Sequence, residues 1–224
     1  NKEVTDPAQL ARNLVRDNVL TKWQAGQLLH GFHALVVGKY KLLEQVSINE
    51  TGRVYLAEHG QLGRKVALKL LAKQYMSNPE IVARFLSEAR VAAAIDHRNI
   101  LHVHDVAQEA DRTFLVTEYV AGQCLNELVK AGPVPLERCV AIMQQLANGM
   151  GTAHEKNVVH GGLRPSTVFL DSQGTVKIID LGVASLADLT GTAQEESTEL
   201  ATDVIAFAAP ERADKTVVAA GDIY

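Results

Sequence analysis

The feature that most constrains the fold is a change of hydrophobic pattern near residue 40. Apolar and polar residues alternate in three runs, 40–46, 54–57 and 66–70, and only short links separate these runs. Alternation with a period of two is typical of β-strands, and short links between consecutive strands favour antiparallel pairing. The chain is therefore restricted to folds that contain an antiparallel meander in this region.

A helix with one unusual residue follows the meander. Asn78, Pro79 and Glu80 supply an N-cap, a proline at the first helical position and an acidic side chain near the positive end of the helix dipole. Glu88 lies seven residues after Ile81, on the same apolar stripe. Because an inward-facing carboxylate is costly without a cation, we expect Glu88 to have a basic partner in a buried ion pair.

The rest of the chain combines further strands and helices. We expect strands near 101–106 and 113–119, a β-hairpin over 167–179, and helices that begin after caps at Asp6 and Thr21. A long amphipathic helix precedes the hairpin, and its expected apolar face consists of Leu136, Cys139, Val140, Met143, Leu146, Met150 and Ala153. These elements predict the α+β class.

Composition and charge narrow the functional classes. The 22 basic and 26 acidic side chains give a net charge of −4, which offers no attraction for nucleic acid or for an anionic membrane. Two cysteines are too few for a disulfide framework, so we expect a reducing, cytoplasmic compartment. No apolar run approaches the roughly 20 residues that a membrane span needs, so we expect no membrane contact within this fragment. Residue 1 is Asn, which suggests a piece of a longer protein.

Five short motifs occur in a fixed order between residue 40 and the end of the chain. They are Val66-Ala67-Leu68-Lys69, Glu88 on the following helix, Ile179-Asp180-Leu181-Gly182, Ala209-Pro210-Glu211 and Gly221-Asp222-Ile223-Tyr224. This ordered set resembles the protein kinase family, and in particular the eukaryotic-like serine/threonine kinases of bacteria.

The resemblance implies a two-lobed protein-kinase-like fold with three parts. Residues 38–120 would form an N-lobe with a five-stranded antiparallel sheet and one helix. Residues 121–224 would form a mostly helical C-lobe that is incomplete at its C-terminus. Residues 1–37 would be a helical extension, a small module packed on the part that follows.

The resemblance also implies a nucleotide site. Lys69 would hold the α and β phosphates of ATP, Glu88 would be its helix partner, and Asp180 would bind magnesium. Thr117 would stand at the back of the pocket. The other residues that would line the nucleotide are Gly52, Val54, Ala67, Glu118, Val120 and Phe169. An alternative needs no nucleotide: Lys69 and Glu88 would be a structural ion pair, with Asp180 retained for packing and hydrogen bonding.

The catalytic loop departs from the kinase pattern at three positions. Gly162 replaces the Asp that acts as base, Thr167 replaces the metal-binding Asn, and Arg164 replaces the Lys that accompanies the transferred phosphate. The loss of a positioned base removes about 10²- to 10⁴-fold in rate. The phosphate loop is altered too, because only Gly52 remains of its glycines and Glu50 places a negative charge near the phosphates.

We therefore expect a pseudokinase: a kinase-like domain with weak or no phosphotransfer that acts as a signalling or scaffold module through protein partners. ATP binding would be weak or absent, with magnesium at Asp180 where ATP binds. One alternative is an active serine/threonine kinase with a non-standard catalytic loop, in which Asp180, Glu195 or Glu196 is the base. Another is a scaffold that binds no nucleotide. His102 and His104 share a strand face, but two ligands without a third do not predict a metal site.

Overall fold

The structure is a computed structural model of the 224-residue chain, and it describes residues 6–49, 52–109, 112–181, 207 and 219–222. The helices are α1 (Pro7–Arg16), α2 (Lys22–Leu29), α3 (Pro79–Ala93), α4 (Leu125–Lys130) and α5 (Leu136–Glu155). The strands are β1 (Val36–Val37), β2 (Tyr40–Asn49), β3 (Gly52–His59), β4 (Lys65–Leu71), β5 (Val103–Glu109), β6 (Arg112–Glu118), β7 (Gly122–Cys124), β8 (Val168–Asp171) and β9 (Val176–Ile178). Short 3-10 turns cover Lys73–Tyr75, Pro165–Thr167 and Ala219–Asp222.

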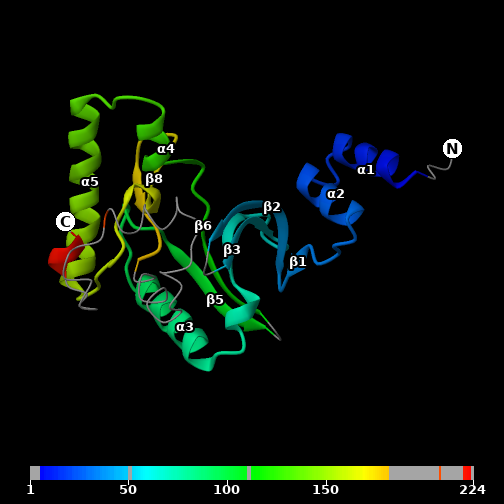
Figure 1. The fold of residues 1–224 in the computed structure, drawn as a ribbon, viewed down its shortest axis with the longest axis horizontal. Coiled ribbons are helices and arrows are strands. Elements are labelled where there is room, and N and C mark those ends of the chain that lie inside the picture. Colours follow the sequence, from blue (N-terminus) through cyan, green and yellow to red (C-terminus); the bar gives the residue numbers. More distant parts are fainter. Residues whose placement is uncertain (1–5, 50–51, 110–111, 182–206, 208–218, 223–224) are drawn as a thin grey trace.

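The larger sheet has six antiparallel strands in the order β1-β2-β3-β4-β6-β5 (Figure 1). The predicted meander is confirmed as β2-β3-β4, and the two later strands are β6 and β5. The sheet has one strand more than the five expected, because β1 contributes only Val36 and Val37 and so carries no alternation that a pattern could show. The predicted strand over 101–106 lies at 103–109 instead.

The two edges of this sheet approach each other. Lys39 Nζ lies 3.3 Å from Asp105 Oδ2, and the ring of Tyr40 meets the ring of Phe114 edge to face at 6.2 Å. The sheet is therefore curled around its own core. That core contains Val37, Tyr40, Leu42, Tyr55, Ala57, Val66, Leu68, Phe114 and Val116.

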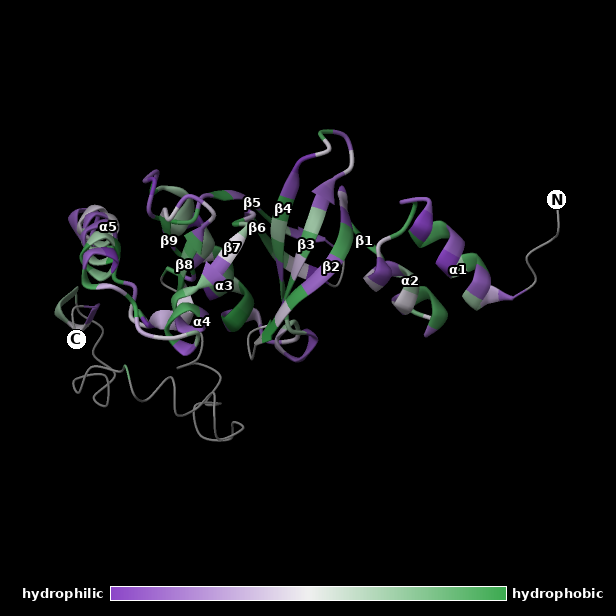
Figure 2. Cartoon of the chain, turned by 90° about the horizontal axis from the view of Figure 1, so that it is seen from above, coloured by the Kyte–Doolittle hydropathy of each residue, from purple (hydrophilic) through white to green (hydrophobic). Residues whose placement is uncertain are grey.

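Helix α3 covers the other face of the sheet. It begins where the capping pattern predicts, because the Asn78 side chain accepts hydrogen bonds from the backbone N–H groups of Glu80 and Ile81. Its apolar residues Ile81, Val82 and Phe85 pack with Leu71 and Tyr75. The sheet thus has two covered faces, with α2 at one and α3 at the other (Figures 1 and 2).

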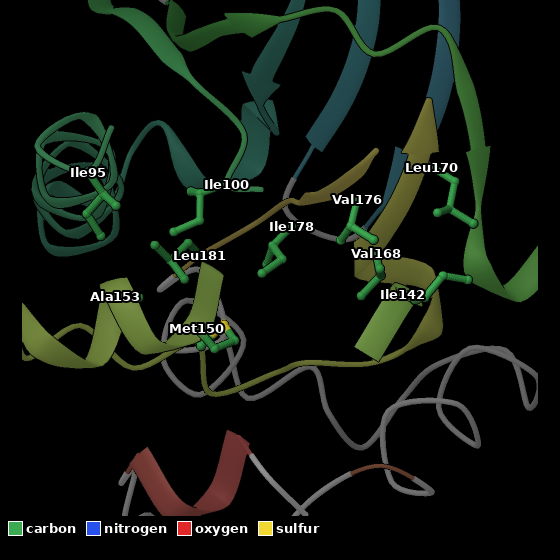
Figure 3. Close-up of a cluster of buried hydrophobic side chains, with 10 residues drawn as sticks. All are labelled: Ile95, Ile100, Ile142, Met150, Ala153, Val168, Leu170, Val176, Ile178 and Leu181. Carbon is green, nitrogen blue, oxygen red and sulfur yellow. The ribbon is translucent and has the colours of Figure 1, made fainter. Parts of the chain in front are cut away.

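The second core joins α5 to the small sheet β7-β8-β9. Figure 3 shows its buried side chains, which are Ile95, Ile100, Ile142, Met150, Ala153, Val168, Leu170, Val176, Ile178 and Leu181. The predicted hairpin is confirmed as β8 and β9. Gly149 lets α5 approach β9 closely, since a Cβ there would lie 2.8 Å from Ile178 Cδ1.

The predicted apolar face of α5 is wrong in its first half. Leu136, Val140 and Met143 are 78%, 47% and 58% exposed, whereas Ile142 is buried. The helix carries two apolar stripes that converge near Met150, and the stripe through Ile142 is the one that the hairpin covers. A helical period alone could not rank these two stripes.

The N-terminal helices form as their capping residues predict. The Asp6 side chain accepts from the N–H groups of Ala8 and Gln9, and Thr21 and Gln24 form a reciprocal capping box. Helix α2 then contacts the first strands of the large sheet, where the indole of Trp23 meets the ring of Tyr55 at 5.7 Å. Figure 1 shows both helices at the end of the molecule that lies away from α5.

Candidate functional site

The site is built around one face of strands β3 and β4. Leu68 is buried in the curled core, and strand alternation turns Lys69 to the opposite face. In the β3–β4 register Val54 pairs with Lys69, and Leu56 pairs with Ala67. Val54, Ala67 and Lys69, which the resemblance names as nucleotide-lining residues, therefore share one face of the sheet.

Lys69 reaches from this face to the segment that follows β9. Its Nζ lies 2.8 Å from Asp180 Oδ1, with the lysine side chain buried and the aspartate partly so. Burial by itself would raise the pKa of Asp180, but the attraction of the Lys69 ammonium outweighs it, and the pKa lies below its ordinary value. Asp180 is therefore a charged carboxylate at neutral pH, held by a cation from the other lobe.

The expected pairing of Lys69 with Glu88 does not form in this structure. Glu88 Oε1 instead lies 3.2 Å from Arg84 Nε, one turn earlier on α3, while Glu88 Oε2 is buried without a hydrogen-bond partner among the described residues. Burial raises the pKa of Glu88 from 4.5 to about 7, against the opposing effects of Arg84 and Lys69. Two carboxylates compete for one ammonium, and the sequence could not show that Asp180 would take it.

Gly52 opens β3 at a point where two backbones come close. It pairs with Leu71, and a Cβ on residue 52 would collide with the carbonyl oxygen of Leu70. Strand packing therefore requires a glycine here, whether or not a phosphate binds nearby. The neighbouring Glu50, expected to weaken phosphate binding, lies outside the described residues.

The residues expected beside adenine come from the end of β6, the link after it, and β8. Thr117 is buried, and its Oγ1 donates to the Glu118 carbonyl oxygen at 3.1 Å. The Glu118 backbone N–H donates to the carbonyl of His102, so what Glu118 can still offer a ligand is its carbonyl. Val120 is half-buried in the link. Phe169 is half-buried too, on the face of β8 that points away from the hydrophobic core.

An ion pair that the sequence analysis missed joins the lobes beside Phe169. Lys177 is the partner of Phe169 in the β8–β9 register, and its Nζ lies 2.7 Å from Glu118 Oε1. The same Oε1 accepts a hydrogen bond from the backbone N–H of His102 at 2.8 Å. Lys177 lies between the buried Val176 and Ile178, so strand alternation turns its side chain away from the core, and this signal in the sequence could have indicated its orientation.

The catalytic loop is closed by the residue that replaces the metal-binding amide. Thr167 Oγ1 accepts from the Arg164 backbone N–H at 3.1 Å and donates to the Arg164 carbonyl at 3.0 Å, with the Gly162 carbonyl at 3.4 Å. The hydroxyl is buried and engaged on both sides, so its role here is to close the turn. Within the part of the chain that the structure describes, Arg164 Nε and Ser166 Oγ are buried without hydrogen-bond partners.

Gly162 lies between a buried histidine and this turn. Its backbone N–H donates to Nδ1 of His160 at 3.2 Å, so the His160 Nε2–H donates to the Ile179 carbonyl at 3.0 Å. Burial lowers the pKa of His160, which therefore stays neutral. Gly161 has a φ of +70°, whereas Gly162 is not among the positive-φ glycines, so its φ does not by itself call for a glycine.

Asp222 anchors the loop from far along the chain. Its carboxylate accepts from the backbone N–H groups of His160 at 2.8 Å and Gly161 at 2.7 Å, and from the ring of His154 at 2.8 Å. Its side chain is 1% exposed. The sequence analysis recognised this position only as part of a motif. Asp222 therefore holds the loop backbone through two hydrogen bonds, although Gly162 itself cannot accept a proton.

Other candidates stay outside this arrangement. The rings of His102 and His104 lie 4.9 Å apart, but among the described residues no group of three or more His, Cys, Asp or Glu side chains could hold a metal ion. Glu195, Glu196 and the Ala209-Pro210-Glu211 motif lie outside the described residues.

The residues present fit one magnesium ion better than two. Magnesium prefers oxygen ligands and commonly takes one or two protein carboxylates together with phosphate oxygens. Asp180 supplies one charged carboxylate, whereas the second protein ligand of kinases is replaced by the Thr167 hydroxyl, which is turned into the loop. When bound, magnesium would neutralise charge on the phosphates.

Comparison with known proteins agrees with this geometry. The family model for the protein kinase domain matches residues 40–224. The serine/threonine-protein kinase PrkC of Bacillus subtilis is 34% identical over 156 residues, which cover 69% of this chain and 24% of PrkC. PknA of Mycobacterium tuberculosis is 31% identical over 194 residues, which cover 84% of this chain and 44% of PknA. The chain thus spans less than half the length of these relatives.

A solved structure shows the same fold. The crystal structure of the M. tuberculosis PknI kinase domain superposes with a TM-score of 0.66 at 25% identity, covering 86% of this chain and 71% of that one. Within the described part of the chain, no helix has the length and apolarity to cross a membrane. The match over 185 of 224 residues, from 40 to 224, decides the assignment. The chain belongs to the protein kinase domain family, and the relatives described above to which it is similar are serine/threonine kinases of bacteria.

Proposed function

We propose that this kinase-fold domain transfers phosphate weakly or not at all and acts through contacts with protein partners, as a signalling or scaffold module that ATP modulates. One observation carries the proposal: Gly162 offers no carboxylate, and the adjacent Thr167 hydroxyl is spent on closing the loop. The base and the second metal ligand are missing together.

The chemistry of phosphoryl transfer sets the expected size of the defect. Protein kinases rely mainly on positioning and on electrostatic stabilisation, and an Asp accepts the proton of the substrate hydroxyl. The loss of that base alone removes about 10²- to 10⁴-fold in rate, or roughly 3 to 5 kcal/mol of barrier stabilisation. Because Asp222 and His160 still hold the loop backbone, the defect lies in the missing groups and not in a collapsed loop.

Nucleotide binding is the part of kinase function that the geometry supports best. Lys69 and Asp180 already lie 2.8 Å apart, so a cation and a carboxylate are in place for phosphate and for one magnesium ion.

The two cysteines, Cys124 and Cys139, are unpaired, which fits the cytoplasmic location that we propose.

An assay with labelled ATP, magnesium and a generic acceptor protein tests the proposal. We expect turnover far below about 1 s⁻¹, the low end of the usual kinase range. The double substitution Gly162→Asp with Thr167→Asn should restore the missing groups and raise turnover by at least tenfold, and Lys69→Met in that background should abolish the gain. Turnover near 1 s⁻¹ by the unsubstituted chain would contradict the proposal and favour an active kinase with a non-standard loop.

Thermal unfolding with and without ATP and magnesium separates the modulated module from a pure scaffold. A ligand that binds the native state must raise the melting temperature, so we expect a rise that Asp180→Asn removes. If saturating ATP with magnesium leaves the melting temperature unchanged, the domain is a scaffold that binds no nucleotide.

A further inference from the structure

Strand β2 contains two irregularities in its register with β3, one at Leu43 next to the N-terminal helices and a second between Gln45 and Ser47. Its register with β3 runs from Leu42 opposite Ala57 to Glu44 opposite Leu56, so Leu43 has no partner across the strand pair. Such a bulge bends a strand and increases its local twist. The bulge lies between the start of β2 and the strand residues 44–48 that run on toward Gly52, so its geometry affects how this part of the hairpin lies.

Two side chains at the start of α2 bind the carbonyl groups at this bulge. Gln24 is 1% exposed, and its Nε2 donates to the Leu42 carbonyl at 2.6 Å. Thr21 Oγ1 donates to the Leu43 carbonyl at 2.6 Å. The extension thus supplies hydrogen-bond donors to two consecutive carbonyl groups at the bulge, and buried backbone groups need such partners.

The same two residues hold each other. Thr21 Oγ1 accepts from the Gln24 backbone N–H at 3.1 Å, and Gln24 Oε1 accepts from the Thr21 backbone N–H at 2.9 Å. Both ends of the Gln24 amide and both functions of the Thr21 hydroxyl are therefore engaged. A capping box satisfies backbone N–H groups at the start of a helix, but here its two side chains also bind the helix to strand β2. Trp23, between the two, packs against Tyr55 on β3.

We propose that Thr21 and Gln24 are positioning residues for the β2–β3 hairpin, through which the N-terminal extension fixes the roof of the nucleotide cleft. The hairpin carries Gly52, and it carries Val54 opposite Lys69. Residues 6–33 then belong structurally to the N-lobe, and a change in α2 alters how strands β2 and β3 lie over a bound ligand. The effect on nucleotide affinity rests on the proposed function, whereas the effect on the hairpin does not.

Hydrogen exchange of the nucleotide-free chain tests the positioning role. Gln24→Met keeps the bulk of the side chain and removes its donor, and Gln27→Met is a matched control, because Gln27 gives no hydrogen bond to β2 in the described part of the chain. We expect exchange in 40–48 and 53–59 to quicken by about five- to hundred-fold in Gln24→Met, since a buried acceptor loses its donor. Exchange in α5 and β9 should stay unchanged.

Thr21 supplies an independent variant. Thr21→Val removes the hydroxyl and should quicken exchange in the same hairpin, whereas Thr21→Ser keeps the hydroxyl and should restore the unsubstituted rate. Hairpin exchange equal to that of the unsubstituted chain in both Gln24→Met and Thr21→Val would overturn the positioning role. Exchange that quickens equally in all elements would also overturn it, because it would show a general loss of stability.

Binding of a fluorescent ADP analogue with magnesium supplies the functional reading. We expect Gln24→Met and Thr21→Val to weaken binding several-fold, while Gln27→Met and Thr21→Ser leave it unchanged. Unchanged binding together with faster hairpin exchange would overturn the claim about the cleft roof and keep the proposed function. If the unsubstituted chain itself does not bind the analogue, the nucleotide part of the proposed function fails, and the exchange result still decides the positioning role.

Discussion

The loop around Gly162 and the group formed by Lys69, Asp180 and Glu88 have lost different things. The loop keeps its anchoring bonds, to Asp222 and within the turn at Thr167, but lacks the groups that perform proton transfer and bind the second metal. The other group keeps all its charged side chains, yet Glu88 is stranded without its lysine. The loop therefore keeps its hydrogen bonds but has lost its catalytic side chains, whereas α3 keeps the Glu88 carboxylate but not its ion pair with Lys69.

A functional site can therefore lose a required residue while its backbone stays in place, or keep a residue while that residue loses its partner. Sequence inspection finds Gly162 at once, because a missing carboxylate is visible in the printed letters. The state of Glu88 is invisible there, because the residue is present and only its partner has changed. If this comparison holds, removing a bond of the loop lowers stability, whereas removing the charge of Glu88 raises stability at high pH.

The largest effect should come from Asp222→Ala. The substitution leaves three donors without their acceptor: the backbone N–H groups of His160 and Gly161, and the ring of His154. Breaking a buried charged network typically costs about 3 to 5 kcal/mol. Denaturant unfolding measures it, with Asp222→Asn as the control that keeps an acceptor oxygen. A loss below about 1 kcal/mol would show that the loop does not depend on this anchor.

The next effect concerns Glu88 and pH. Its pKa in the folded protein, about 7, lies above the ordinary 4.5, so folding favours the protonated form. The stability that this group contributes is fully present below pH 4.5 and is lost as the pH rises through 7, a difference of about 3 kcal/mol at most. Glu88→Gln removes this loss.

Unfolding free energies at pH 5 and pH 8 test the Glu88 prediction. The difference between Glu88→Gln and the unsubstituted chain should shift in favour of the variant by about 1 to 3 kcal/mol between these pH values. Glu80→Gln, on an exposed position of the same helix, is the matched control and should show no such trend. A parallel pH dependence in Glu88→Gln and the unsubstituted chain would mean that Glu88 is ionised and paired in solution.

A smaller effect is expected from Thr167→Val. The methyl group replaces a buried hydroxyl of nearly the same shape and leaves the Arg164 backbone N–H and carbonyl without that partner. The expected cost is about 1 to 3 kcal/mol. Thr167→Ser keeps the hydroxyl and should recover most of the stability measured by thermal unfolding. If Val is as stable as Thr, the hydroxyl has another role than closing the turn.

Local signals explain which parts of the fold could be predicted. The meander, α3 and the β8–β9 hairpin follow from alternation, an N-cap and a turn, all of which lie within a few residues. The two-residue β1 has no period to detect, and α5 has two apolar stripes of which packing selects one. Those outcomes depend on distant segments.

The site divides along the same line. Strand alternation places Val54, Ala67 and Lys69 on one face, and the family pattern identifies Gly162, Arg164 and Thr167 as substituted positions. The choice of Asp180 over Glu88 as partner for Lys69 is set by the distance between lobes, which no local pattern encodes. The same holds for the Glu118–Lys177 pair, whose members are 59 residues apart.

The smallest effect is expected at the Glu118–Lys177 ion pair, and it tests whether an ion pair outside the loop also stabilises the fold. Glu118 and Lys177 join the lobes with side chains that are 25% and 16% exposed, so the pair lies between the surface and the buried cases. We expect Lys177→Met to lower the free energy of unfolding by about 1 kcal/mol. Partial burial limits the screening of the attraction that is lost, but the substitution also removes the cost of desolvating the lysine ammonium. Chemical unfolding at low and at high salt measures it.

Lys39→Met supplies the matched comparison, because its pair with Asp105 is 54% and 40% exposed and should contribute less than the Glu118 pair, with most of that contribution lost at high salt. Lys177→Arg should keep the bridge. An effect of Lys177→Met no larger than that of Lys39→Met would place the Glu118 pair with ordinary surface pairs. A larger effect that persists at high salt would show that the Glu118–Lys177 pair stabilises the junction of the lobes, as the hydrogen bonds of Asp222 stabilise the loop. Glu88, which lacks its pair with Lys69, would then differ from both.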